Sequence, residues 1–348
     1  MKEKLKYWII LLLLIIQGCI TDQEVTTVFS TDGSCLRKVT FKSDEKKFDL
    51  SDLNIPVDST WAVTVRKDTA DTSKFFIRAE KHFANVEELN FLYDSLPHNF
   101  SGIQRNITWK VKFRWFYTFY DYTETISALF HQRPMSEFMT PEEIRYALAE
   151  DDEKDSLFSN LDSTALEELD ERVDEKGWKW IAACTFDEVF KGLLKTAGEH
   201  PVGVFTVENL EKEKDSLLKR FENVAEDSAF NGYFARTFGI EDFDSLVNTY
   251  PDNFKTYKEL EDVVGRTFGE EYVNKIQLPG TLVYTNAEKT ENGMLAWKIG
   301  SMKFLGEDYI MEAVTKKSNP WAFYIAIFVV LLAVMFWIVP LKKKKKPQ

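Results

Sequence analysis

The longest unbroken apolar stretch of the chain covers residues 321–341, which contain no charged side chain and are followed by five lysines. At a rise of about 1.5 Å per residue, a helix of this length spans roughly 30 Å, the thickness of the hydrocarbon core of a bilayer. Trp321, Tyr324 and Trp337 lie near its ends, where amphipathic rings favour the membrane interface. The pattern predicts one transmembrane helix over 321–341 and a basic tail, 342–348, held in the cytoplasm.

Alternating apolar and polar positions predict strands in the first third of the chain. A hairpin is expected over 24–42, where alternation runs up to and away from a Thr-Asp-Gly-Ser turn. Two further strands are expected over 61–65 and 75–79, and residues 83–95 have the apolar spacing of a helix. These elements indicate a β-rich start to the chain.

Residues 107–126 show the strongest alternation outside the apolar C-terminal stretch, which predicts a strand. One parity is aromatic and apolar throughout: Trp109, Val111, Phe113, Trp115, Tyr117 and Phe119. The other parity begins basic and becomes aromatic: Lys110, Lys112, Arg114, Phe116, Tyr120 and Tyr122. We expect one face to belong to the core. The second face, with Lys112, Arg114, Phe116, Tyr120 and Tyr122, is either a binding platform or a second buried face.

The pattern becomes helical after residue 134. Thr140 and Glu143 frame a capping box with Pro141 at the first helical position, and amphipathic stripes continue to about residue 275. Thr185, with Glu188 three residues later, predicts the start of a separate helix within this region.

Strand character returns at residue 278, where a Pro-Gly pair precedes two alternating segments. The predicted fold class is therefore α+β: a mainly antiparallel β domain, 19–133 plus 278–314, with a large helical insertion, plus one C-terminal transmembrane helix. The acidic helical insertion, 134–277, is longer than any connecting loop, so we expect it to fold as a subdomain.

The N-terminus carries a second membrane signal, in which a basic segment precedes an apolar core at 7–16. The following Ile-Gln-Gly-Cys resembles the lipobox of bacterial lipoproteins, which predicts a signal peptide over 1–18 and lipidation of Cys19. An ordinary signal peptide and an uncleaved anchor are the alternatives. Every version leaves 20–320 outside the cytoplasm. The predicted location is the bacterial cytoplasmic (inner) membrane, single-pass, with both tethers in one bilayer.

Net charge and cysteine content narrow the choice of partners. The chain carries −12, of which the first six residues contribute +2 and the lysine tail +5, so the remainder carries −19. Such a surface makes nucleic acid and anionic lipid headgroups poor partners. Besides Cys19, only Cys35 and Cys184 are present; a disulfide and two separate buried thiols are both compatible with the sequence.

Residues 278–299, followed by a short linker and the apolar C-terminal stretch, resemble the LppM-like bacterial membrane lipoproteins. The resemblance rests on Pro279, Gly280, Asn286 and Trp297, and Cys19 agrees with the lipoprotein signal of that family. It implies an envelope lipoprotein and supplies no catalytic residues.

No motif in the sequence indicates catalysis, a cofactor or a metal. The four histidines do not stand at metal-ligand spacing, and phosphate-binding loops and serine-nucleophile motifs are missing. We therefore expect a non-enzymatic cell-envelope lipoprotein whose exported, periplasmic domain binds a partner protein or an envelope component. An envelope hydrolase acting on glycan or peptide, and a subunit of a membrane complex, are the alternatives.

Overall fold

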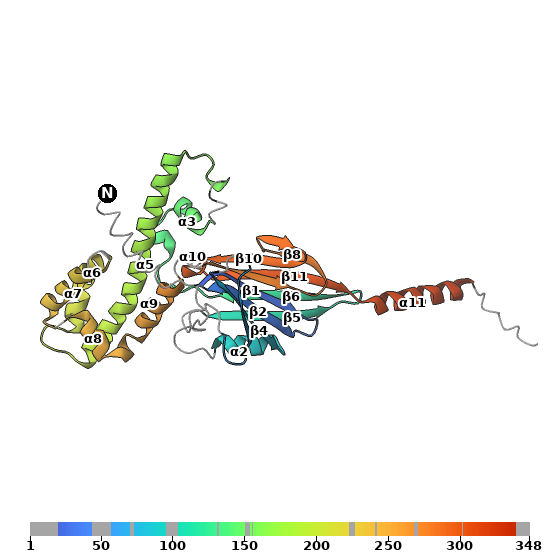
Figure 1. Ribbon diagram of the computed structural model, residues 1–348, viewed down its shortest axis with the longest axis horizontal. Helices are drawn as coiled ribbons and strands as arrows, with labels where there is room; N and C mark the ends of the chain where they lie inside the picture. Colours follow the sequence, from blue (N-terminus) through green and yellow to red (C-terminus); the bar gives the residue numbers. More distant parts are fainter. Residues whose placement is uncertain are drawn as a thin grey trace, which may run out of the picture.

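The computed structural model confirms an α+β protein with antiparallel sheets, a large helical region and an apolar C-terminal helix. In Figure 1 a helical block lies at one end, a β sandwich in the middle and helix α11 (Pro320–Ile338) at the other end. Cys19 and the tail 342–348 lie outside the described residues. The structure describes residues 20–43, 57–69, 73–94, 104–130, 132–149, 154, 156–222, 227–240, 242–267, 271–300 and 302–338.

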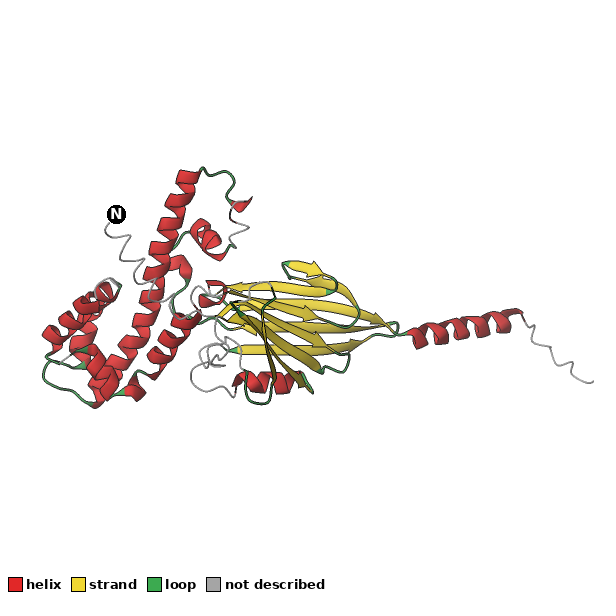
Figure 2. Cartoon of the chain, viewed as in Figure 1, coloured by secondary structure: helices red, strands yellow, loops and turns green. Residues whose placement is uncertain are grey.

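Two sheets face each other in the sandwich (Figure 2). All neighbouring strands run antiparallel except the parallel pair β1 and β7. The seven-stranded sheet has the order β3 (Ala62–Lys67), β4 (Phe75–Phe83), β2 (Cys35–Ser43), β1 (Ile20–Phe29), β7 (Glu271–Gln277), β10 (Met294–Gly300), β9 (Lys289–Glu291). The four-stranded sheet has the order β5 (Arg105–Phe113), β6 (Tyr117–Ile126), β11 (Tyr309–Ser318), β8 (Thr281–Thr285).

The sandwich buries the inward parity of its strands, as a period of two requires. Val25, Val39 and Ile77 from the larger sheet meet Ile107 and Ile126 from the smaller one. Helix α2 (Val86–Asp94) packs on β4 and β5 and closes one side of this core. The expected hairpin over 24–42 and the helix over 83–95 are confirmed by β1–β2 and α2.

Two sequence-based assignments around the sandwich were wrong. Residues 107–126 form two strands rather than one, because the chain reverses at 114–116 and Arg114 N donates to Tyr117 O. Strand structure also returns before residue 278, in β7. The sequence pattern does not predict that strand, because its central inward position is the polar Asn274, which breaks the apolar alternation.

The helical block is built around α5 (Ser163–Glu199), which runs for 37 residues. The predicted helix start at Thr185 is wrong. Thr185 lies inside α5, where its hydroxyl donates to Ile181 O at 2.9 Å. The capping box of Thr140 and Glu143 is confirmed at the start of α3. The other helices are α3 (Pro141–Leu148), α6 (Val207–Phe221), α7 (Asp227–Phe238), α8 (Phe243–Thr249), α9 (Lys255–Thr267), and the short η2 (Met135–Glu137) and η4 (Pro251–Asn253).

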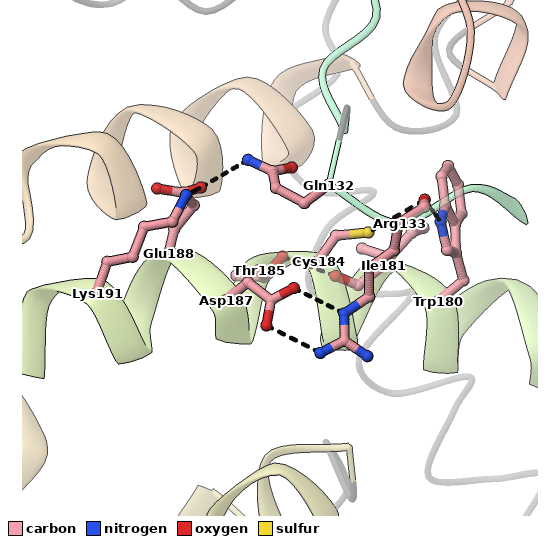
Figure 3. Close-up of polar contacts among 9 residues, drawn as sticks. All are labelled: Gln132, Arg133, Trp180, Ile181, Cys184, Thr185, Asp187, Glu188 and Lys191. Atoms are coloured by element: carbon pink, nitrogen blue, oxygen red, sulfur yellow. Dashed lines mark hydrogen bonds and ion pairs between the residues drawn. The ribbon is translucent and has the colours of Figure 1, made fainter. Parts of the chain in front are cut away.

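The segment after β6 fastens the sandwich to α5 (Figure 3). The Arg133 guanidinium donates to both Asp187 oxygens at 2.6 and 2.9 Å, and the Arg133 carbonyl accepts from Trp180 Nε1 at 2.8 Å. Gln132 Nε2 donates to Glu188 at 2.7 Å. Nearby, α10 (Met302–Leu305) holds this segment through backbone hydrogen bonds. Its Leu305 packs into the buried apolar cluster between this segment and α5. The two parts are therefore joined by directed contacts as well as by the chain.

Candidate functional sites

The five residues of the predicted binding face do not share a surface. Tyr120 and Tyr122 point into the sandwich, where they are 5% and 1% exposed. Lys112 lies on the outer face of β5 and forms an ion pair with Asp121. Arg114 and Phe116 belong to the turn between β5 and β6. The reversal of the chain at this turn changes which parity faces inward, so the single face inferred from the sequence is divided between core and surface.

The turn of this hairpin forms an exposed aromatic tip, residues 113–117, against the first turn of α11. The Phe113 ring stacks on Trp321 at 6.2 Å between centroids, and the Trp115 ring meets Trp321 edge-on at 5.2 Å. Phe116 and Tyr117 contact Phe323 at 4.9 and 6.0 Å. The four aromatic residues of the tip remain between 38% and 56% exposed: Phe113, Trp115, Phe116 and Tyr117.

Asn319 connects the aromatic tip to the start of α11. Its backbone N–H donates to Phe116 O at 2.9 Å, and its side-chain amide donates to Arg114 O at 2.9 Å and Trp115 O at 3.3 Å. Its side-chain oxygen accepts from the Thr118 hydroxyl at 3.0 Å. The side chain thus satisfies two carbonyls of the turn, and the tip is hydrogen-bonded to the residue that directly precedes α11.

Positive charge gathers just above the tip, on the outer faces of β5 and β11. Lys112 and Lys316 both pair across the ladder with Phe119 of β6, so they flank one ring. Lys316 Nζ lies 5.4 Å from the centre of the Tyr117 ring. Arg114 and Lys317 are also exposed. This arrangement contrasts with the acidic balance of the chain as a whole.

A second site lies inside the sandwich, where Glu124 joins the two sheets. Its carboxylate is fully buried and accepts from Tyr122 at 2.5 Å, Asn274 at 3.0 Å and Arg105 at 3.4 Å. Arg37 Nη2 lies 3.9 Å away, on the opposite sheet. Glu124 is therefore hydrogen-bonded within its own sheet to Tyr122 and Arg105, and it contacts the facing sheet through a hydrogen bond from Asn274 and the ion pair with Arg37.

Electrostatics keep Glu124 ionised in spite of its burial. Burial by itself raises the pKa of this carboxyl, but the charges of Arg37 and Arg105 and two hydrogen bonds outweigh it, so the pKa lies below its ordinary value of 4.5. Burial and the neighbouring Glu124 charge raise the pKa of Tyr122 well above its ordinary value, which keeps the phenol a donor. The cluster is thus two cations and one anion in the core.

The Glu124 cluster was missed in the sequence, although a signal was present. Arg37 occupies an inward position between Cys35 and Val39, and Glu124 occupies one between Tyr122 and Ile126. A charged residue at an apolar parity of a strand indicates a buried ion pair, but the sequence does not show which opposite charge meets it. Arg37 is 1% exposed and its guanidinium nitrogens make no hydrogen bond.

The two remaining cysteines are separate buried thiols. Cys35 belongs to the sandwich core and Cys184 to the cluster at the joint, and both are free. Burial raises the pKa of Cys35 to about 11 and that of Cys184 to about 12. Of the alternatives left open by the sequence, the structure has two unpaired thiols.

Comparisons with protein-family models, with curated proteins and with solved structures gave no match to this chain. Within the described part of the chain, no three His, Cys, Asp or Glu side chains lie together in a way that could hold a metal ion. The described residues contain one helix, α11, that is long and apolar enough to cross a membrane.

Proposed function

We propose that the protein is a single-pass envelope protein that α11 anchors in the bacterial cytoplasmic membrane, and that its exported part binds a partner protein. The observation that carries the proposal is α11 itself: its most apolar window has a mean hydropathy of 2.6, is only 6% buried, and projects away from the sandwich (Figure 1). A helix with apolar side chains on all sides requires lipid or protein around it. The lysines after residue 341 favour a cytoplasmic C-terminus.

The route of the chain constrains the second tether. β1 begins at the end of the sandwich next to the helical block, because it runs parallel to β7, which directly follows that block. β11 covers the distance from that end to α11 in ten residues, roughly 30 Å at about 3.3 Å per residue. A lipid on Cys19, bonded to Ile20, would start about that far from the bilayer entry of α11.

This geometry changes the expectation that both tethers lie in one bilayer. With β1 paired and the sandwich upright on α11, a lipid at Cys19 lies far above the membrane. It reaches the same bilayer only if the first residues of β1 leave the sheet or the sandwich lies on its side. We therefore propose α11 as the anchor that sets the position of the protein. The lipoprotein signal and the LppM-like resemblance support an envelope location.

The helical block is the part that we propose to meet the partner. It lies at the end of the molecule opposite α11 (Figure 1). The loop between α5 and α6 exposes Val202 and Val204, and the first residue of α6, Val207, is exposed beside them; Val202 is 60% exposed. Exposed apolar side chains gathered in a short loop are typical of protein contacts.

Membrane extraction tests the anchor. With Cys19 replaced by Ala in both chains, alkaline carbonate should leave the full chain in the membrane fraction and release a chain that stops after Asn319. Retention of that shortened chain would mean that α11 is not the anchor. The shortened chain with Cys19 intact then shows whether a lipid also holds it.

Crosslinking tests the partner. A photoreactive residue at position 202 should give a discrete adduct in cells. The same residue at Phe91, which is 68% exposed on α2, is the matched control because it lies on the sandwich. Equal adducts from both positions, or none from 202, would refute a partner at the helical block.

A further inference from the structure

We propose that the aromatic tip docks on the interfacial layer of the bilayer that α11 crosses, and that this contact holds the sandwich upright. The inference rests on the proposed spanning role of α11 and adds a second, non-spanning contact with the same membrane. The partner is the lipid surface itself: the interfacial layer, which accommodates aromatic rings, and the phosphate headgroups.

The depth of the tip follows from its contacts with α11. Every ring of the tip lies within 6.2 Å, between centroids, of Trp321 or Phe323. One turn of helix advances about 5.4 Å, so the tip lies level with the first turn of α11. The apolar stretch begins at Trp321. The tip therefore lies where the chain passes from headgroups to hydrocarbon.

The tip also has the chemistry of that layer. Four of its five residues are exposed aromatic side chains, and Trp and Tyr rings are enriched at membrane interfaces, where one end of the ring is apolar and the other wet. Arg114 lies among the rings, and Lys112, Lys316 and Lys317 lie on the adjoining ends of β5 and β11. Basic side chains beside a membrane are attracted to anionic headgroups. Asp121 pairs with Lys112 here, while Arg114, Lys316 and Lys317 add positive charge at this end of an otherwise acidic protein.

The tip cannot turn away from the bilayer once α11 is inserted. Asn319 binds three carbonyls of the turn through its backbone and side-chain N–H groups, so the hairpin follows the helix. Continuity with α11 is also the reason to choose lipid over a protein cover: any bilayer around α11 meets the tip without a further binding event.

Depth-dependent quenching tests the docking. The full chain is labelled with an environment-sensitive fluorophore at Phe116→Cys in the tip, Phe328→Cys in α11 or Val202→Cys in the helical block. The chain without an added cysteine gives the background. Each is placed in phosphatidylcholine–phosphatidylglycerol vesicles that carry a nitroxide near either the top or the end of the acyl chain.

Each outcome separates the tip from the anchor. We expect the shallow nitroxide to remove most fluorescence from position 116, the deep one from 328, and neither from 202. Quenching at 328 without quenching at 116 overturns the docking and leaves the spanning helix intact. No quenching at 328 refutes the proposed function itself. Energy transfer between labels at 116 on different copies would assign the tip to a second copy and also overturn the proposal.

A second measurement tests whether docking orients the sandwich. Trp115→Ser with Phe116→Ser removes two exposed rings, so the fold should persist. We expect the distances between a donor at position 202 and acceptor lipids to spread and shorten on average as the sandwich tilts. Phe91→Ser, which removes an exposed ring on α2 away from the membrane, should leave the distribution unchanged. A distribution that is the same for the tip variant and the wild type overturns the orienting role.

Discussion

Replacement of Glu124 by alanine removes the anion that lies against two buried cations. Arg37 and Arg105 would remain in the core, and Tyr122 and Asn274 would each lose an acceptor. Removing one partner of a buried ion pair typically costs about 3–5 kcal/mol, because the surviving charge stays desolvated. We expect Glu124→Ala to lower the free energy of unfolding of the sandwich by that amount.

The assay has to report the sandwich separately from the helical block. Hydrogen exchange of peptides from β1, β6 and β7, measured across a urea series on the full chain in mild detergent, does so. Glu80→Gln is the matched control: it breaks the exposed Arg78–Glu80 pair, and such pairs contribute about 0–1 kcal/mol. If Glu124→Ala shifts the β6 midpoint no more than the control, the buried cluster does not hold the sheets together.

The same cluster makes the stability of the sandwich depend on pH in the acid range. The pKa of Glu124 is lower in the folded chain than its ordinary value of 4.5, so below that value the unfolded chain takes up the proton first. Stability from this group is complete above about pH 4.5 and is lost as the pH falls through the folded-state pKa. Glu124→Gln should reduce the loss of unfolding free energy at low pH. An unchanged loss would contradict the assignment of this pH dependence to Glu124.

Three further predictions concern other parts of the chain. Gly192→Ala should destabilise the helical block by about 1–2 kcal/mol in urea unfolding, because its Cβ would lie 2.5 Å from the Phe254 ring, a clash larger than the gain in helix propensity; equal or greater stability would refute this. Maleimide should modify Cys35 and Cys184 only after unfolding, as peptide mapping would show, since burial raises both pKa values; labelling of the native chain contradicts this. Asn319→Ala should increase hydrogen exchange in the β5–β6 turn by at least about tenfold, and an unchanged rate would mean that other contacts hold the tip.

Much of the fold could be predicted from signals that are local in the sequence. The parts that depend on contacts between distant segments could not. The Thr140 capping box and the β1–β2 hairpin depend on neighbours within a few residues, so their residue types specify them. The division of 107–126 into two strands depended on a three-residue turn whose aromatic residues continue the alternation on both sides. A turn made of such residues resembles a strand in the sequence. The residue that stabilises it, Asn319, lies some two hundred positions later and gives no local signal.

The candidate sites show the same limit in sharper form. Glu124 and Asn274 are 150 positions apart, and their contact brings together strands on either side of the helical insertion. β7 pairs with β1 in parallel, which no turn between them announces. The alternation of β6 predicts that Tyr122 and Glu124 share a face, but the partner sheet decides whether that face is surface or core.

The path of the chain makes the sandwich a spacer of fixed length between α11 and the helical block. β6 and β11 pair residue by residue over their whole lengths. The segment that follows β6 holds α5 through Arg133, and the residue that follows β11, Asn319, holds the aromatic tip against α11. Two hydrogen-bonded strands thus connect both joints, and Glu124 on β6 ties them to the facing sheet. Tilting the helical block relative to α11 therefore requires breaking a clamp or bending this ladder. A partner bound to the helical block would be held more than the length of β11, roughly 30 Å, above the membrane, which is the arrangement that a docked aromatic tip would preserve.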